Sequence, residues 1–413
     1  MGVTSLAMIR HFEFGNFCSY RETVAISFAV SASVNTDHSF APSVSNDQVS
    51  LLMGVFGANA SGKTNLLKGL VFLSFFLRHS YQHLGEKDPI PVDGFFHLSQ
   101  ANPVSFKVEF EGNGSLYRYE CELLPSTVVS EKLSQFHLET GHFRTLMARD
   151  AEGKVTARDF DVDRVAISRL IKDRPNASMF AAGLLTGSEE IARIDRAFGV
   201  VETNVNRSGK KDGVSDNELQ SLIEAAAYFD SNPHLAENLE ERLIAADLGI
   251  SGFTIKKTTL FDANKQREED VPFPFVRHRV EGAEVEFPLA LESSGTKRLF
   301  LVLRRFFPVL TDGGIAVIDE MESDMHPHLI PTLLDLFADL ELNPKKAQLL
   351  FTCHHVEILN RLAKEQIVLV EKDANCVSHA KRLSDIPGVR REENFFARYN
   401  AGYYGAIPQP AVF

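Results

Sequence analysis

Short runs of consecutive apolar residues recur along the chain, and several of them end at polar residues. The clearest runs are residues 51–56, 314–318, 349–351 and 367–370. Continuous apolar runs of this length are typical of strands that are buried on both faces of a parallel sheet. Residues 64–73 follow the first run and carry apolar side chains at helical spacing. Strands that alternate with helices in this way predict an α/β fold.

Other segments alternate apolar and polar residues or have helical periodicity. Residues 104–110 and 116–121 alternate on either side of the turn residues 111–114, which predicts a hairpin of an antiparallel β subdomain. Amphipathic helices are predicted at 219–229 and 235–248, further strands at 8–17, 273–280 and 285–289, and a loop at 31–50. The pattern therefore predicts an N-terminal part (1–125), an inserted, partly helical lobe (126–284) and a C-terminal part (285–413).

The composition is that of a globular protein, with 44% hydrophobic and 24% charged residues among 413. The net charge of -12 argues against a generally basic, nucleic-acid-coating surface. Arg207, Lys210 and Lys211 form a local basic patch that either contacts phosphates or lies in a solvated loop. The four cysteines are far apart, so neither a disulfide framework nor a structural zinc site is predicted. Without a membrane-spanning run or a signal peptide, a cytoplasmic protein with no membrane partner is expected.

A phosphate-binding loop is predicted where the first apolar run meets the first helix. Residues 57–64 read Gly-Ala-Asn-Ala-Ser-Gly-Lys-Thr and fit the pattern G-x-x-x-x-G-K-[ST]. In this pattern the glycines bring backbone N–H groups onto phosphate oxygens, the lysine neutralises the β- and γ-phosphates, and the hydroxyl ligates Mg²⁺. Lys63 and Thr64 would have these last two roles. The strand and helix that the motif requires are both predicted here.

Acidic residues follow a second apolar run. Asp319 and Glu320 come directly after residues 314–318. One carboxylate can hold Mg²⁺ through water, and the next can polarise an attacking water, which is an arrangement for hydrolysis. The alternative is a strand that ends in a solvated acidic turn.

Two further motifs each allow more than one interpretation. Ser293, Ser294 and Gly295 precede an apolar helix at 299–309, so they form either an anion site or a serine N-cap with nothing bound. His354 follows the run 349–351 and could deliver an imidazole to a γ-phosphate or to the attacking water. A structural histidine is one alternative, and a metal site with His355, His326 and His328 is another. The metal site is disfavoured because neighbouring strand residues point to opposite faces.

The order of these motifs resembles that of the ATP-binding-cassette (ABC) ATPases, including the heads of SMC-type proteins. A phosphate loop (Walker A), a distant serine-glycine signature, an Asp-Glu strand (Walker B) and a switch histidine follow one another in the same sequence. More closely, segments 292–300, 317–320, 342–348 and 404–408 resemble AAA-type ATPases of the overcoming-lysogenisation-defect (OLD) lineage. This lineage includes RloA-type proteins and the ATPase subunits of PARIS-type phage-defence systems. The resemblance implies an ABC-type P-loop NTPase head with ATP and Mg²⁺ as cofactors.

The resemblance also implies site residues and a composite site. In ABC-type ATPases two heads sandwich ATP, and each signature loop caps the γ-phosphate held by the other protomer. By this analogy Asp319 supports Mg²⁺ with Thr64, Glu320 is the general base, His354 is the switch, and Ser323 and Asp324 lie at the dimer seam. The signature residues Ser293, Ser294 and Gly295 would act in trans. The phosphates would be surrounded by Gly57, Asn59, Ser61, Gly62, Lys63, Thr64 and Asn65. The signature reads Ser-Ser-Gly-Thr where transporters have Ser-Gly-Gly-Gln, so slow turnover is compatible with it.

The lineage implies a sensor or scaffold in bacterial anti-phage defence, an ATPase that forms a homo-oligomer and controls a separately encoded nuclease or toxin. Nuclease-fused relatives carry a TOPRIM domain with a glutamate and then paired aspartates. Glu371 ends the run 367–370, but no Asp-x-Asp follows it, so the effector is expected to be another protein. The trigger would be DNA or a phage protein. The alternative function is a DNA-repair or recombination ATPase that clamps DNA directly, and a small-molecule kinase is disfavoured because it would leave the signature and the switch histidine without a role.

Overall fold

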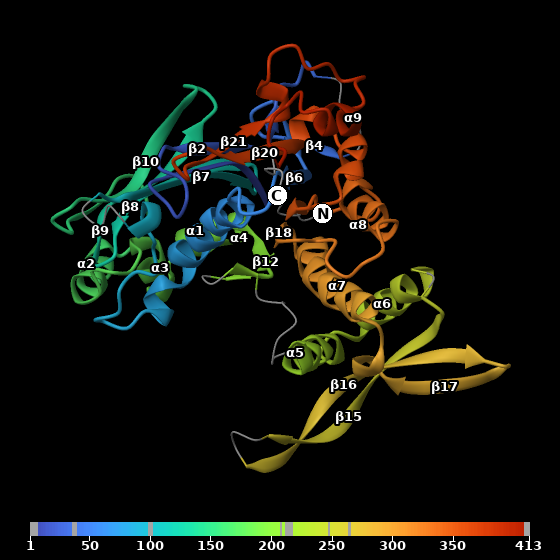
Figure 1. Ribbon diagram of the computed structural model, residues 1–413. Coiled ribbons are helices and arrows are strands. Elements are labelled where there is room, and N and C mark those ends of the chain that lie inside the picture. The colour runs from blue at the N-terminus through green and yellow to red at the C-terminus, as the bar shows by residue number, and fades with distance from the viewer. Residues whose placement is uncertain are drawn as a thin grey trace. The chain divides into compact units, whose positions relative to one another are not determined.

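The computed structural model describes residues 7–34, 39–97, 102–206, 209–210, 218–246, 248–262 and 266–408 (Figure 1). The chain divides into two compact units. The first consists of Met1–Gly209, Val309–Glu320 and Leu334–Phe413, and the second of Lys210–Pro308 and Met321–Leu333. The part of the predicted inserted lobe up to Gly209 therefore belongs to the first unit. Arg207 and Lys211 of the predicted basic patch lie outside the described residues.

A mostly parallel sheet in the first unit contains the strands that the apolar runs predict. Its order is β12 (Val200–Thr203), β18 (Gly314–Ile318), β19 (Gln348–Thr352), β6 (Leu52–Phe56), β20 (Ile367–Lys372) and β21 (Ser378–Arg382). Neighbouring strands are parallel except for the antiparallel pair of β20 and β21. β6, β18 and β19 are buried along their whole length. Their carboxyl ends meet at one edge of the sheet, which is where open α/β sheets bind ligands.

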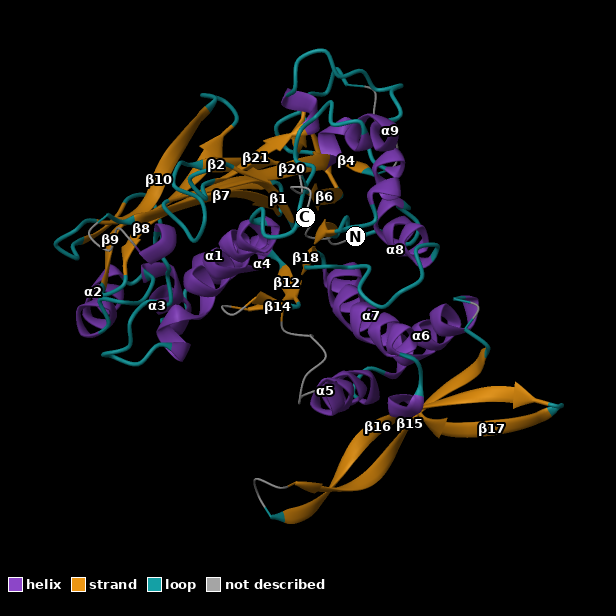
Figure 2. Ribbon diagram, viewed as in Figure 1, coloured by secondary structure: helices purple, strands orange, loops and turns teal. Residues whose placement is uncertain are grey.

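A larger antiparallel sheet forms the second layer of this unit (Figure 2). Its order is β11 (Val155–Ala157), β10 (His142–Arg149), β9 (Thr127–His137), β8 (Ser115–Leu124), β7 (Val104–Gly112), β1 (Met8–Gly15) and β2 (Val24–Ser27). The predicted hairpin is confirmed as β7 and β8. Asn113 and Gly114 both have positive φ, as a two-residue turn of this kind requires. The predicted α/β fold with an antiparallel subdomain is therefore confirmed.

The prediction of a loop at residues 31–50 is wrong in part. A small sheet there has the order β3 (Ala29–Val30), β5 (Gln48–Ser50) and β4 (Phe40–Pro42). Phe40, Ala41 and Val49 are buried, and their burial explains why a segment rich in serine and asparagine has strand structure. Residues 35–38 of the predicted loop lie outside the described part.

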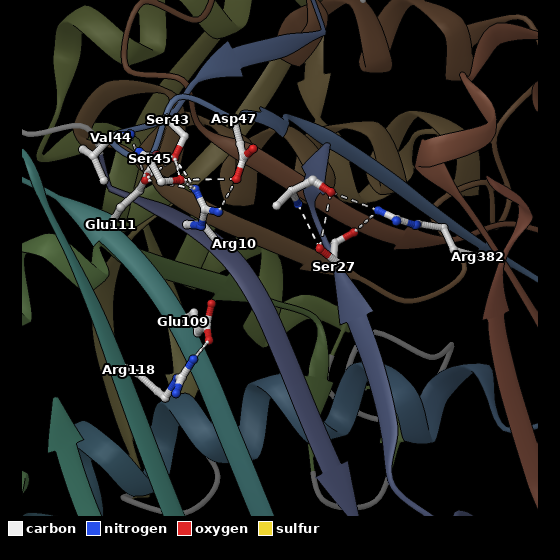
Figure 3. A network of polar contacts seen from close by, with 11 residues as sticks. Arg10, Ser27, Ser43, Val44, Ser45, Asp47, Glu109, Glu111, Arg118 and Arg382 are labelled. Atoms are coloured by element: carbon white, nitrogen blue, oxygen red, sulfur yellow. Dashed lines mark hydrogen bonds and ion pairs between the residues drawn. The ribbon is translucent and has the colours of Figure 1, made fainter. Parts of the chain in front are cut away.

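A partly buried polar network ties this small sheet to the large one (Figure 3). Ser43 Oγ and the Val44 N–H donate to Glu111 Oε2 over 2.7 and 3.2 Å. Arg10 of β1 pairs with Asp47 over 3.0 Å. Burial raises the pKa of the Glu111 carboxyl, and the hydrogen bond from Ser43 opposes this shift. Segment 43–47 is thus held by side chains of β1 and β7.

The long helix α1 lies between the two sheets of the first unit and contacts strands of both. It extends over Lys63–His83, and Gly69 in its middle packs on Phe14 of β1 so closely that a Cβ atom would collide with the ring. The remaining helices and short strands of this unit are α2 (Arg164–Asp173), α3 (Met179–Leu185), α4 (Glu189–Phe198), α9 (Phe395–Asn400) and β13 (Val205–Asn206). Three elements span the boundaries between the units, namely α7 (Ser294–Asp312), α8 (Leu329–Ala338) and β14 (Gly209–Lys210).

The second unit combines two helices with a three-stranded antiparallel sheet. Its elements are α5 (Glu218–Asp230), α6 (Pro233–Ala245), β15 (Ile250–Asp262), β16 (Arg267–Val280) and β17 (Ala283–Pro288). Phe300 of α7 packs on Phe229 of α5 and Phe253 of β15, with ring centroids 5.7 Å apart in both pairs. The helices and strands predicted at 219–229, 235–248, 273–280 and 285–289 are confirmed, except that the second helix ends at Ala245.

The sequence predicts neither a membrane-spanning segment nor a disulfide framework. No helix within it has the length and apolar character that crossing a membrane requires. All the cysteines lie within the described residues, and none forms a disulfide.

Candidate functional site

The loop of residues 57–62 connects β6 to α1 and is shaped by close backbone contacts. A Cβ atom on Gly57 would collide with the carbonyl oxygen of Val370, and one on Gly62 would collide with Ser378. Gly62 also has φ of 117°, a conformation that L side chains rarely adopt. The structure therefore explains the two glycines of the motif by steric contacts with β20 and β21.

Lys63 is the first residue of α1, and its side chain folds back over the loop. Its ammonium group donates hydrogen bonds to the carbonyl oxygens of Gly57 and Ala58 over 2.9 and 3.0 Å. The lysine is buried, whereas Asn59 and Ala60 at the crest of the loop are exposed. The Lys63 ammonium group thus lies within a loop at the N-terminus of a helix. The lysine charge and the helix dipole both favour an anion there.

Three side chains from outside the motif support the loop. Tyr20 donates its hydroxyl to the carbonyl oxygen of Gly62 over 3.2 Å, and Ser378 donates to that of Ser61 over 2.6 Å. Asn65 donates to Ser19 over 2.9 Å. Burial raises the pKa of Tyr20, so its hydroxyl stays protonated and can donate. The sequence offers no signal for Ser19, Tyr20 or Ser378, because their contacts with the loop depend on the fold.

The Asp319 carboxylate connects three neighbouring strands of the parallel sheet. Its Oδ2 accepts a hydrogen bond from Thr64 Oγ1 over 2.7 Å, and its Oδ1 accepts one from Thr352 Oγ1 over 2.6 Å. Thr64 follows β6, Asp319 follows β18, and Thr352 ends β19. The structure thus brings the predicted pair Thr64 and Asp319 together. A hydroxyl and a carboxylate that face each other are the hard oxygen ligands that Mg²⁺ prefers, so these residues fit that ion.

Glu320 has an unusual backbone conformation that Thr352 helps to hold. Its φ is 45°, in the left-handed region, and its N–H donates to Thr352 Oγ1 over 2.7 Å. Its side chain is half-buried. The sequence analysis did not identify Thr352, although a polar residue at the end of an apolar strand was a usable signal. These contacts fix the backbone of Asp319 and Glu320. Asp319 is 3% exposed, so the alternative of a solvated acidic turn does not hold for it.

His354, the predicted switch histidine, lies after the strand and not at its end. β19 ends at Thr352, so His354 is in the following loop, where its side chain is exposed. His326 and His328 contact each other with ring centroids 4.9 Å apart. The described part of the chain contains no group of three His, Cys, Asp or Glu residues that could hold a metal ion.

The predicted signature residues lie in the second unit, at the start of α7. Ser293 Oγ accepts a hydrogen bond from the Thr296 N–H over 3.2 Å, so the serine caps the helix as one of the two interpretations predicts. Ser293 and Ser294 are nevertheless exposed. A Cβ atom on Gly295 would lie 2.7 Å from the carbonyl oxygen of Asp324, which leaves room only for glycine. Ser323 is half-buried and Asp324 is exposed in the same unit.

Two solved structures are similar over most of their length. One is the SmcHead bound to the C-winged helix domain of ScpA, with a TM-score of 0.43, 13% identity and coverage of 90% of this chain and 96% of that chain. The other is the Smc head domain with an extended coiled coil bound to the C-terminal domain of ScpA derived from Pyrococcus furiosus, with a TM-score of 0.41, 13% identity and coverage of 92% and 97%. No curated protein matches the chain.

A match to a family model shows the family of the chain. Residues 52–360 match the family model described as "AAA domain, putative AbiEii toxin, Type IV TA system". The matched segment includes the phosphate loop, the signature residues, Asp319, Glu320 and His354, and it spans more than half of the chain. The protein therefore belongs to this family of AAA ATPase domains.

Proposed function

We propose that the chain binds ATP with Mg²⁺ and hydrolyses it at the edge of the parallel sheet. The observation that carries this proposal is that three neighbouring strands deliver Lys63 and Thr64, Asp319 and Glu320, and Thr352 to one place. Thr352 joins Asp319 Oδ1 and the Glu320 N–H through hydrogen bonds of 2.6 and 2.7 Å. A phosphate loop and an acidic pair held this close together match what phosphoryl transfer to water requires.

Each side chain has a role that its position supports. Lys63 moves its ammonium group from the loop carbonyls to the phosphate oxygens, which are stronger acceptors. Thr64 and Asp319 hold Mg²⁺, which neutralises phosphate charge when bound. Glu320 accepts a proton from the attacking water as the general base. His354 is exposed in the loop after β19, and we assign it the contact with the γ-phosphate.

We further propose that a second copy of the chain completes the site. Ser293 and Ser294 are exposed at the N-terminus of α7, where the helix dipole favours an anion. In a homo-oligomer these residues of one protomer cap the phosphate that the other protomer's loop holds. ATP then links two protomers, and hydrolysis releases them.

The proposed biological role is control of a separate effector in defence against phage. Support comes from the family description, which names a toxin and a toxin–antitoxin system. It also comes from the resemblance of segments 292–300 and 404–408 to the OLD lineage. The chain would act as the sensor and scaffold, and a nuclease or toxin encoded by a neighbouring gene would be the effector.

Phage challenge of cells that carry the gene with its natural neighbours tests this role. We expect fewer plaques on these cells than on cells without the genes, and full plaque counts when Lys63→Ala replaces the wild type. Lys68→Ala, a lysine change one turn further along α1, is the matched control and should keep protection. Expression of the chain without its neighbours should leave growth normal.

Two results would contradict the role. Growth arrest by the chain alone would make it the toxin. Nucleotide-dependent binding of the purified chain to duplex DNA, with a steep loss of affinity as salt rises, would favour the alternative DNA clamp.

A further inference from the structure

A buried asparagine holds the main chain of Asp319. Asn204 directly follows β12 and is 1% exposed. Its Nδ2 donates a hydrogen bond to the carbonyl oxygen of Asp319 over 2.9 Å, and the Asp319 N–H donates to its Oδ1 over 2.7 Å. One side chain thus provides hydrogen-bond partners for both the N–H and the C=O group of Asp319.

The end of a strand ladder explains why this asparagine is needed. The parallel pairing of β12 and β18 reaches Thr203 and Val317 and goes no further. Thr203 Oγ1 accepts a hydrogen bond from the Val205 N–H over 2.9 Å. This turn directs the chain away from β18 after β12 ends. Asp319 lies beyond this point and is buried, so its N–H and C=O need other partners. A carboxamide carries a donor and an acceptor side by side, as a peptide group does, and can therefore replace the missing strand.

The same contact limits how far Glu320 can move. Glu320 has left-handed φ, and the chain leaves the first unit directly after it. Its own N–H is held by Thr352. The carbonyl oxygen of the same peptide bond, that of Asp319, is held by Asn204. Together these contacts keep a strained backbone in one conformation, as is common at functional sites.

We propose that Asn204 is a positioning residue for the ATPase site. It touches neither phosphate nor metal. Instead it fixes the main chain of Asp319, and through it the direction of the Asp319 carboxylate and the place of the Glu320 carboxylate. This inference rests on the proposed hydrolysis of ATP at this site, and it adds a residue that no motif of the family segment identifies.

Asn204→Ala and Asn204→Asp test the proposal with three measurements. Alanine removes both hydrogen bonds, and aspartate keeps the shape but turns an oxygen towards the Asp319 carbonyl. We expect kcat for ATP to fall about ten- to a hundredfold in both, because misplacement of reacting groups has effects of this size. The Kd for ATP in EDTA, which depends on the phosphate loop alone, should stay within about threefold of the wild type. The extra thermal stabilisation that Mg²⁺ adds to a non-hydrolysable ATP analogue should be lost.

Asn206→Ala is the matched control, because Asn206 lies two residues further on and its side chain is exposed. It should match the wild type in all three measurements. Unchanged kcat and unchanged Mg²⁺-dependent stabilisation in folded Asn204 variants would overturn the positioning role. An equal loss of ATP binding in EDTA and of turnover would also overturn it, because that result indicates a general structural role. If the wild type itself does not hydrolyse ATP, the proposed function fails first, and the measurements distinguish the two failures.

Discussion

Replacement of Glu320 by glutamine is expected to lower ATP turnover about a hundredfold or more, the range found when a general base is removed. The amide cannot accept a proton from the attacking water, while it keeps the size of the glutamate side chain. The N–H of residue 320 still donates to Thr352 Oγ1, so the backbone should be unchanged. Phosphate release at saturating ATP, measured in the steady state, gives the change in kcat.

The binding of ATP should survive this substitution. Lys63 and the loop carbonyls are untouched, so the Kd for ATP should change by less than about threefold. Glu357→Gln removes an exposed carboxylate from the segment after His354 and is the matched control, with turnover expected to equal that of the wild type. Normal turnover in Glu320→Gln would show that another group activates the water.

Replacement of Glu131 by alanine should produce the largest loss of stability. Glu131 lies on β9, is 1% exposed, and accepts hydrogen bonds from Tyr119 Oη, Ser178 Oγ and the Met179 N–H over 2.8, 2.5 and 2.8 Å. Removal of the carboxylate leaves these buried donors without their acceptor. A buried donor left without its acceptor costs about 1–3 kcal/mol, so three such donors are expected to lower the free energy of unfolding by about 3–5 kcal/mol.

Calorimetry can measure this effect as a fall of about 10 °C in the melting temperature of the first unit, given its size. Glu139→Ala changes an exposed glutamate in the loop that follows β9, and it should melt with the wild type. A Glu131→Ala protein that melts within about 2 °C of the wild type would contradict the account, because such a shift corresponds to less than about 1 kcal/mol.

The sequence predicts those parts of the site in which the chemistry is local. The loop from Gly57 to Thr64 has its spacing fixed by the shape of a phosphate and a helix N-terminus, so eight consecutive residues identify it. Asp319 follows a continuous apolar run, and such runs predict buried parallel strands. Ser293 was predicted to cap a helix or hold an anion, and the cap is observed.

Contacts between distant segments could not be predicted in this way. Asn204 and Asp319 are 115 residues apart, and Ser378 and Ser19 are 359 apart. They meet because β12 lies beside β18 and β21 lies at the other edge of the sheet, and no periodic pattern encodes that order. A short polar residue after a short strand, as at Asn204, has no distinct signal of its own.

The strands beyond residue 125 were difficult to assign for a related reason. β9 continues the large antiparallel sheet, but a register shift interrupts its pairing with β8 near Glu122 and Leu123. A charged residue, Glu131, then occupies a buried position of the strand. Both features break the alternation of apolar and polar residues from which strands are predicted. The segment therefore resembles part of an insertion, although it belongs to the first unit.

We expect ATP to join two copies of the chain through sites to which each contributes. The mass of Glu320→Gln in solution, measured by light scattering with and without ATP and Mg²⁺, tests this expectation. We predict that the mass rises only when both are present, and that Ser293→Arg in the same background abolishes the rise. Ser231→Arg, an exposed serine of the second unit, should have no effect. A mass that does not respond to nucleotide, or a rise that persists with Ser293→Arg, would contradict the composite site.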